Sequence, residues 1–205
     1  MRKLDLLAMV LFLICFSHKT WSKDFYVHPK LGRDSHSGTS KDQAFQSLKR
    51  ASQVQFAAGD RLLLASGQVF WGELHLVKQQ GRKDSPIGIT TVVWEESERL
   101  IPALIDFKGH ANGILLEACS FIRLSKLKLT GNGFHPDSLA QGHMRCGVLI
   151  TNQSGFTSTY ISLNQLEIFD VFFENEGFTR GKEEVRTANG TQRYGWGIRA
   201  INAFL

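Results

Sequence analysis

The sequence predicts an all-β chain folded as a parallel β-helix, a solenoid in which short strands stack coil upon coil. Residues 121–129 and 160–168 share the pattern aromatic, Ile, polar, Leu, two polar, Leu, polar, aliphatic. The glycine-led segment 113–116 likewise matches 147–150 and, more loosely, 197–200. A unit this short cannot bury its aliphatic face alone, whereas coils stacked at about 4.8 Å can. An antiparallel β-sandwich is the alternative, but hairpin signals are sparse.

The first 22 residues have the layout of a secretory signal peptide. A basic start, Arg2 and Lys3, precedes an apolar run of 11 residues, and a polar stretch follows. The small residues Thr20 and Ser22 stand three and one positions before the expected cleavage site. A bilayer-spanning helix needs about 20 apolar residues, so no membrane span is expected. We therefore expect residues 1–22 to be removed and the protein to be secreted, to the extracellular space or the periplasm.

The N-terminal part of the remaining chain, about residues 23–60, is expected to cap the solenoid. Residues 24–29 indicate a short strand, and a loop rich in turn-forming residues follows. A capping-box spacing then precedes apolar residues at i, i+4 and i+7. The residues concerned are Ser40 and Gln43 for the box, and Ala44, Leu48 and Ala51 for the apolar positions. This pattern predicts a short amphipathic helix between about residues 44 and 54.

The coils are expected over about residues 61–205. The apolar run 61–65 suits a strand covered on both faces. Further strands are expected at 69–77 with an interruption at Gly72, at 86–94 and at 101–107. The two repeats have different offsets, 34 and 39 residues, so loops must protrude at 132–145, 154–159 and 172–194. Protruding loops on one side of a solenoid are where binding surfaces usually lie.

Charge and cysteine content restrict the function only weakly. The formal net charge is +5, and loss of the leader removes a net +2 and leaves +3. No Lys/Arg-rich block is present, so nucleic acid is not an expected partner. Cys119 and Cys146 remain after cleavage and fall in different slots of successive coils. We expect two buried free thiols rather than a disulfide.

Several segments resemble the N-terminal portion of pectate-lyase-like right-handed parallel β-helix proteins. The similarity lies in residues 28–39 and 44–48, in 59–72 and in 86–90, and it continues through 102–106 and the glycine-led repeat. The resemblance implies a right-handed coil and a structural turn role for Asp106. It does not settle activity, because that group includes polysaccharide lyases, glycoside hydrolases and non-catalytic members. No catalytic set of the group matches this sequence, so no catalytic residue is assigned.

Some side chains are nevertheless candidates for binding. Arginine pairs with carboxylates and aromatic rings stack on sugars, which indicates a sugar-binding set of His143, Arg145, Arg193, Tyr194, Trp196 and Arg199. Trp196 suits the core equally well. Carboxylates at Asp170, Glu174 and Glu176 are candidate Ca²⁺ ligands, against the alternative of a solvated acidic loop. No other cofactor is expected. Asn152 and Asn189 are glycosylation acceptors if the source is a eukaryote.

The sequence thus favours a secreted carbohydrate-active protein that acts on an extracellular polysaccharide, as a lyase or a glycoside hydrolase. The alternatives are a non-catalytic glycan-binding or surface structural protein, and an inactive fragment. The chain stops at Leu205 within what reads as a new coil, without a polar cap. We therefore expect the β-helix to be C-terminally incomplete, and its uncapped end is a candidate surface for self-association.

Overall fold

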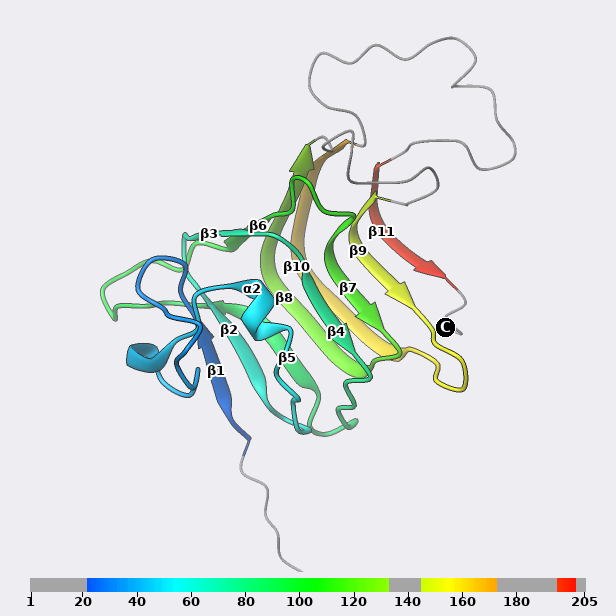
Figure 1. Cartoon of the computed structure of the whole chain (residues 1–205), viewed down its shortest axis with the longest axis horizontal. Helices are drawn as coiled ribbons and strands as arrows, with labels where there is room; N and C mark the ends of the chain where they lie inside the picture. The colour runs from blue at the N-terminus through cyan, green and yellow to red at the C-terminus, as the bar shows by residue number, and fades with distance from the viewer. Residues whose placement is uncertain (1–21, 133–144, 173–194, 202–205) are drawn as a thin grey trace, which may run out of the picture.

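The computed structural model describes residues 22–132, 145–172 and 195–201, which form two curved parallel β-sheets and little helix (Figure 1). The larger one, sheet A, contains β1 (Asp24–Val27), β2 (Arg61–Ala65), β3 (Val69–Trp71), β5 (Ile87–Val92), β6 (Ala103–Asp106), β8 (Ser120–Asn132) and β10 (Thr159–Phe172). Sheet B contains β4 (Leu74–Val77), β7 (Asn112–Glu117), β9 (Arg145–Thr151) and β11 (Gly195–Ile201). No helix in these ranges is long and apolar enough to cross a membrane.

The segments that match in sequence lie side by side in space. In sheet A, β10 pairs with β8 so that Leu163 lies opposite Leu124 and Leu166 opposite Leu127. In sheet B, β7, β9 and β11 pair in parallel, with Ile114, Val148 and Ile198 at one level. The chain is therefore all-β with parallel pairing between its named strands, and aliphatic residues of successive segments stack in rows.

Strand β8 is long because it contains a corner. Its first half pairs with β5 and its second half with β6, and Lys126 stands between the two halves at φ 54°. The equivalent residue of β10, Gln165, has φ 51°. A single residue in the left-handed region turns the chain sharply at a cost of about 1–2 kcal/mol for a non-glycine residue. The same turn therefore recurs in both strands.

The glycines that lead the first two repeated motifs, Gly113 and Gly147, are required by close packing. A Cβ on Gly113 would lie 2.8 Å from the Gly147 carbonyl oxygen, and one on Gly147 would lie 2.7 Å from that of Gly197. Each also would meet a core side chain, Leu129 or Ile168 respectively, at under 3 Å. Only a residue without a Cβ lets neighbouring segments approach this closely.

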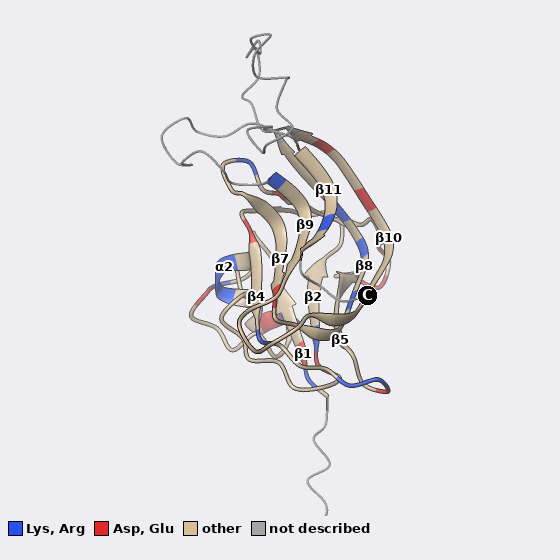
Figure 2. Ribbon diagram, turned by 90° about the vertical axis from the view of Figure 1, so that its right-hand side faces the viewer, with Lys and Arg blue, Asp and Glu red and all other residues tan. Residues whose placement is uncertain are grey.

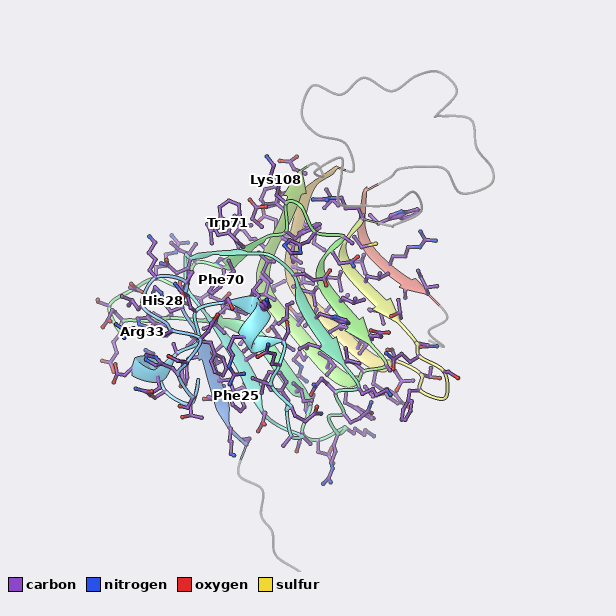
Figure 3. The ribbon with its side chains drawn as sticks, viewed as in Figure 1. Phe25, His28, Arg33, Phe70, Trp71 and Lys108 are labelled. Carbon is purple, nitrogen blue, oxygen red and sulfur yellow. The ribbon has the colours of Figure 1, made fainter. Side chains whose placement is uncertain are left out.

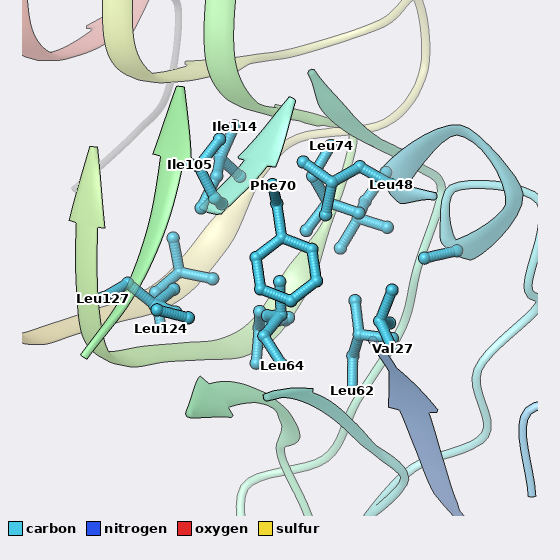
Figure 4. Close-up of a cluster of buried hydrophobic side chains, with 14 of the residues drawn as sticks. Val27, Leu48, Leu62, Leu64, Phe70, Leu74, Ile105, Ile114, Leu124 and Leu127 are labelled. Carbon is cyan, nitrogen blue, oxygen red and sulfur yellow. The ribbon is translucent and has the colours of Figure 1, made fainter. Parts of the chain in front are cut away.

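The core lies between the sheets and is made of the inward rows. Its fully buried members include Leu62 and Leu64 of β2, Phe70 of β3 and Ile105 of β6 (Figure 4). The alternating burial of β4, β5 and β6 shows that each strand sends every second residue into this core. Cys119 and Cys146 are buried and unpaired, as expected, and burial raises the pKa of each thiol to about 11.

The predicted amphipathic helix is mostly absent. A 3-10 turn, η1 (Lys41–Gln43), follows Ser40 without a side-chain cap, and the helix α2 covers only Leu48–Ala51. The helix is capped instead by Ser47, whose Oγ accepts from the Arg50 amide at 3.0 Å. The prediction failed because the backbone at Phe45 is taken up in sheet-like pairing with β1. The three apolar positions are all buried nonetheless.

That pairing closes the first edge of sheet A. On the side of β1 away from β2, the Tyr26 amide donates to the Gly38 carbonyl at 2.7 Å, and the His28 amide donates to the Phe45 carbonyl at 2.9 Å. The His28 side chain is also buried, and its Nδ1 accepts from the amides of Lys30 and Leu31 at 3.1 Å. Covering an edge in this way removes the unpaired backbone groups to which another strand could add.

Candidate functional site

The outer face of sheet B brings together the chemically capable side chains. In β4, Leu74 and Leu76 are buried, so His75 and Val77 face outward. The strand register then places His75, Leu115, Leu149 and Arg199 in one row across β4, β7, β9 and β11. At about 4.8 Å per strand, the two ends of this row are roughly 14 Å apart. We refer to this row, together with the adjacent residues Glu117, Gln153 and Trp196, as the sheet B face.

A hydrogen-bonded cluster lies at the β4 end of the sheet B face. The His75 Nε2 atom is 3.0 Å from the Glu117 carboxylate, and the Gln153 amide donates to the other oxygen of that carboxylate at 2.7 Å. The His75 backbone amide is held by the Ser52 hydroxyl at 3.0 Å. The His75 side chain is 39% exposed, so the imidazole is both fixed and reachable from solvent.

The charge of Glu117 is stabilised by these neighbours. The hydrogen bond from Gln153, assisted by His75, lowers the pKa of Glu117 below its usual value, although burial acts in the opposite direction. An ionised carboxylate that accepts from an imidazole fixes the orientation of the ring. This arrangement of a base and the group that orients it is typical of general acid–base catalysis.

An aromatic and a guanidinium group lie at the other end of the sheet B face. The Trp196 side chain remains 41% exposed in β11, and the Arg199 guanidinium carbon lies 4.7 Å from the centre of its ring. Both residues belong to the sugar-binding set predicted from the sequence. An exposed indole beside a guanidinium group can stack on a sugar ring and pair with a carboxylate.

Arg145 is placed differently from the prediction. Its side chain is fully buried at the start of β9 and donates to the backbone carbonyls of Gly131, His110 and Phe107 at 3.1, 2.9 and 3.4 Å. The guanidinium also lies 5.0 Å from the centre of the Phe107 ring, and burial lowers the pKa of Arg145 to about 10. The surface role expected for Arg145 is corrected to a structural one, because a buried guanidinium that serves backbone carbonyls cannot contact a glycan.

The other predicted residues are only partly covered by the structure. His143, Arg193, Tyr194, Glu174, Glu176 and Asn189 lie outside the described residues. Asp170 is exposed in β10 at φ 48°, and within the described ranges no group of three or more His, Cys, Asp and Glu residues could hold a metal ion. Asn152 is half-buried and accepts from the Ser158 amide at 2.7 Å. Asp106 holds a turn, as expected, by accepting from the Lys108 amide at 3.0 Å.

The pair of His75 and Glu117, which are 42 residues apart, was not predicted from the sequence. The sequence did contain a signal. The alternating Leu74 and Leu76 match Ile114 and Leu116, which aligns the two strands. In that alignment His75 lies opposite Leu115, and Glu117 follows two residues later on the neighbouring strand. The contact itself depends on the length of the histidine and glutamate side chains, which reach across that diagonal.

Two other surface features compete with the sheet B face. A hollow of about 530 Å³ lies on the outside of sheet A and is lined by Arg61, Asp84, Thr90, Arg123 and Ser125 among others. It is less suited to an acidic glycan, because Arg61 is already paired with Asp24 at 2.6 Å and Asp84 adds negative charge. The second feature is Trp71 of β3, which is 68% exposed and stands near Lys108 (Figure 3).

Basic and acidic residues are interspersed along the described ribbon rather than gathered on one side (Figure 2). Besides the Arg61–Asp24 pair, an ion pair joins Lys128 of β8 to Glu167 of β10 at 2.6 Å. A ligand of sheet B would therefore be met by individual hydrogen bonds and ring contacts rather than by a uniformly charged surface.

No protein-family model and no curated protein matches the sequence. Among solved structures, the chain is similar to a GH136 lacto-N-biosidase from Eubacterium ramulus, with a TM-score of 0.64 and 21% identity over 97% of this chain and 35% of that one. Its selenomethionine derivative gives the same TM-score at 23% identity, over 87% and 30%. A rhamnogalacturonan lyase follows, with a TM-score of 0.52 and 16% identity over 87% of this chain and 51% of the other.

These similarities show the fold alone. The chain spans about a third of the length of the lacto-N-biosidase and about half of that of the rhamnogalacturonan lyase. The lacto-N-biosidase and the lyase therefore share with this chain an arrangement of β-strands, and the same arrangement can carry different active sites.

Proposed function

We propose that this chain belongs to an exported right-handed parallel β-helix protein that binds an extracellular polysaccharide along the sheet B face. The observation that carries the proposal is the placement of the His75–Glu117–Gln153 cluster and the Trp196–Arg199 pair on one face, roughly 14 Å apart. Between the two groups the row continues through Leu115 and Leu149, of which Leu149 is only 8% exposed. The similarity to a lacto-N-biosidase and a rhamnogalacturonan lyase supports a carbohydrate ligand for a fold of this kind.

Each end of the sheet B face has its own task. The exposed indole of Trp196 stacks on a sugar ring, and Arg199 pairs with a carboxylate of the glycan. At the other end, His75 transfers a proton and Glu117 holds the imidazole in place. The two groups divide binding from chemistry, because the aromatic group lies three strands away from the imidazole.

The lowered pKa of Glu117 fits a group that orients His75 and does not fit the general acid of a hydrolase. A hydrolase needs a carboxylic acid that keeps its proton until it donates it to the leaving group, and this requires a raised pKa. The pKa of Glu117 is lowered instead. In a lyase, His75 removes the proton beside the carboxylate of a uronate, the electrons form a new C=C bond, and the glycosidic oxygen leaves and takes up a proton from water.

The test is incubation of the exported protein with a panel of uronate-containing and neutral polysaccharides, with and without Ca²⁺. We expect unsaturated oligosaccharides from at least one acidic polysaccharide. His75→Ala should lower the rate by about 10²–10⁴-fold, the usual contribution of a general acid or base. If the activity depends on Ca²⁺, the result would support Asp170, Glu174 and Glu176 as ligands of the ion. New reducing ends without unsaturated products would replace the lyase by a hydrolase.

A non-catalytic glycan-binding protein is the second candidate. It is favoured by the exposed Trp196 ring beside the Arg199 guanidinium, because this pair can bind a sugar without any catalytic group. In that case the same panel should give saturable binding to one glycan and no products. Binding without products would remove the catalytic role of His75 and leave the binding role of Trp196.

A further inference from the structure

A buried carboxylate near the start of β1 has no cationic partner in the described chain. The Asp60 side chain is 2% exposed. Its Oδ1 accepts from the Lys23 backbone amide at 2.7 Å, and its Oδ2 accepts from the Ala57 amide at 2.8 Å. The adjacent guanidinium, Arg61, turns away to Asp24. Burying a carboxylate without a cation is costly, and two amide donors offset only part of that cost.

The amide that contacts Asp60 belongs to the residue that follows the expected leader. Its position is well fixed, because the Lys23 carbonyl accepts from the Arg61 amide at 2.8 Å and β1 begins at the next residue. On the other side, the Ser22 Cβ lies 3.3 Å from where a Cβ on Gly59 would be. Gly59 has φ 90°, and its turn leads directly to Asp60.

We propose that the leader is removed by hydrolysis of the Ser22–Lys23 peptide bond and that the new α-ammonium group of Lys23 forms an ion pair with buried Asp60. Water adds across the bond, so that Ser22 takes the carboxylate and Lys23 takes the amine, which binds a proton at neutral pH. The nitrogen that donates to Asp60 as a neutral amide then donates as a cation. This inference rests on the proposed export but not on the proposed glycan site.

The pair makes the folded state sensitive to processing. A charge-assisted hydrogen bond is about twice as strong as a neutral one, and the cation is the partner that a buried carboxylate otherwise lacks. The contact joins the start of β1 to the turn before β2, which is the first pairing of sheet A. The folded N-terminal end is therefore more stable in the exported chain than in the precursor that carries the leader.

The experiment compares three forms of the chain ending at Leu205, each prepared by release from a cleavable fusion. One begins at Lys23, one keeps Trp21 and Ser22 in front of it, and one begins at an Nα-acetylated Lys23. We expect the form with the free amine to melt about 2–4 °C higher than the other two. Asp60→Asn should lower its melting temperature and abolish the difference between the three forms. Asp24→Asn, which removes an exposed pair, should leave that difference in place.

Equal melting temperatures for the free and acetylated forms would overturn the ion pair, as would a difference that persists in Asp60→Asn. If Asp60→Asn does not fold, the comparison of the free and acetylated wild-type forms still decides the question. Mass spectrometry of the protein recovered after export should give Lys23 as its first residue, and another first residue would overturn the proposed cleavage site. These outcomes are independent of whether any glycan binds or is cleaved.

Discussion

The two ends of the described strand stack contain the same kinds of residue in different surroundings. At the first end, Val27 of β1 and Phe45 beside it are fully buried, and backbone hydrogen bonds cover the outer edge of β1. At the other end, β10 and β11 each pair on one side only within the described residues. There the inward Leu163 is only partly buried, and Ile198 is 48% exposed.

This difference shows that burial in a stack of strands is set by the next layer and not by the residue. Leu124 of β8 and Leu163 of β10 occupy the same place in the repeated pattern and lie opposite each other. Leu124 is fully buried because β10 covers it, whereas no described strand covers Leu163. The same aliphatic pattern therefore contributes different amounts of free energy at the two positions.

The largest expected effect comes from shortening these two leucines. Leu124→Ala should lower the free energy of unfolding by about 3 kcal/mol, because it leaves a cavity in a packed core. Leu163→Ala should cost about 1 kcal/mol, because its side chain already meets solvent. Urea denaturation of both variants measures the difference. Equal losses would mean that β10 is covered as completely as β8.

A smaller effect is expected from adding a methyl group at two equivalent glycines. In Gly147→Ala the new Cβ meets the Gly197 carbonyl oxygen and Ile168, whereas in Gly197→Ala it meets nothing within 4 Å. We expect Gly147→Ala to cost about 1–3 kcal/mol through overpacking and Gly197→Ala to be nearly neutral. A comparable loss in both variants, measured by the same urea titration, would contradict the stacking described for β9 and β11.

The smallest expected effect is a pH dependence of stability that arises from His28, at the end of the stack where the edge of β1 is covered. Burial, assisted by Lys30, lowers the pKa of His28 below its usual value, so folding favours the neutral imidazole. The contribution of His28 is therefore present above the unfolded pKa of about 6.5 and is lost as the pH falls through the folded pKa. His28→Asn, which keeps an acceptor for the turn amides, should lose less stability between pH 7 and pH 5 than the wild type. Equal losses would assign the acid sensitivity to other groups.

Much of the fold could be predicted from the sequence, because the alignment of repeated segments gives the register in which their strands pair. The matched segments 121–129 and 160–168 pair in the structure as they align in the sequence. The helix expected at 44–54 was wrong, because periodicity records which residues are buried but not whether the backbone bonds to itself or to β1. Ala44, Leu48 and Ala51 are core residues in either arrangement.

The candidate site was predicted less well for a related reason. Arg145 reads as a surface residue in sequence, but its partners are backbone carbonyls, which no residue pattern reveals. His75 and Glu117 meet only because β4 and β7 stack, and each is unremarkable in its own segment. Trp196 and Arg199 could be found because their side-chain types, an aromatic ring and a guanidinium group, indicate sugar binding wherever the strand places them.

The proposed location of the glycan is tested most directly by removing one exposed indole at a time. Trp196 lies on the sheet B face and Trp71 on β3 of sheet A, so each serves as the control for the other. We expect Trp196→Ala to weaken binding of the best polysaccharide in the panel by about 5–100-fold, the usual contribution of a stacking ring, and Trp71→Ala to leave it unchanged in isothermal titration calorimetry. Loss of binding in Trp71→Ala with none in Trp196→Ala would contradict the account and place the glycan on sheet A.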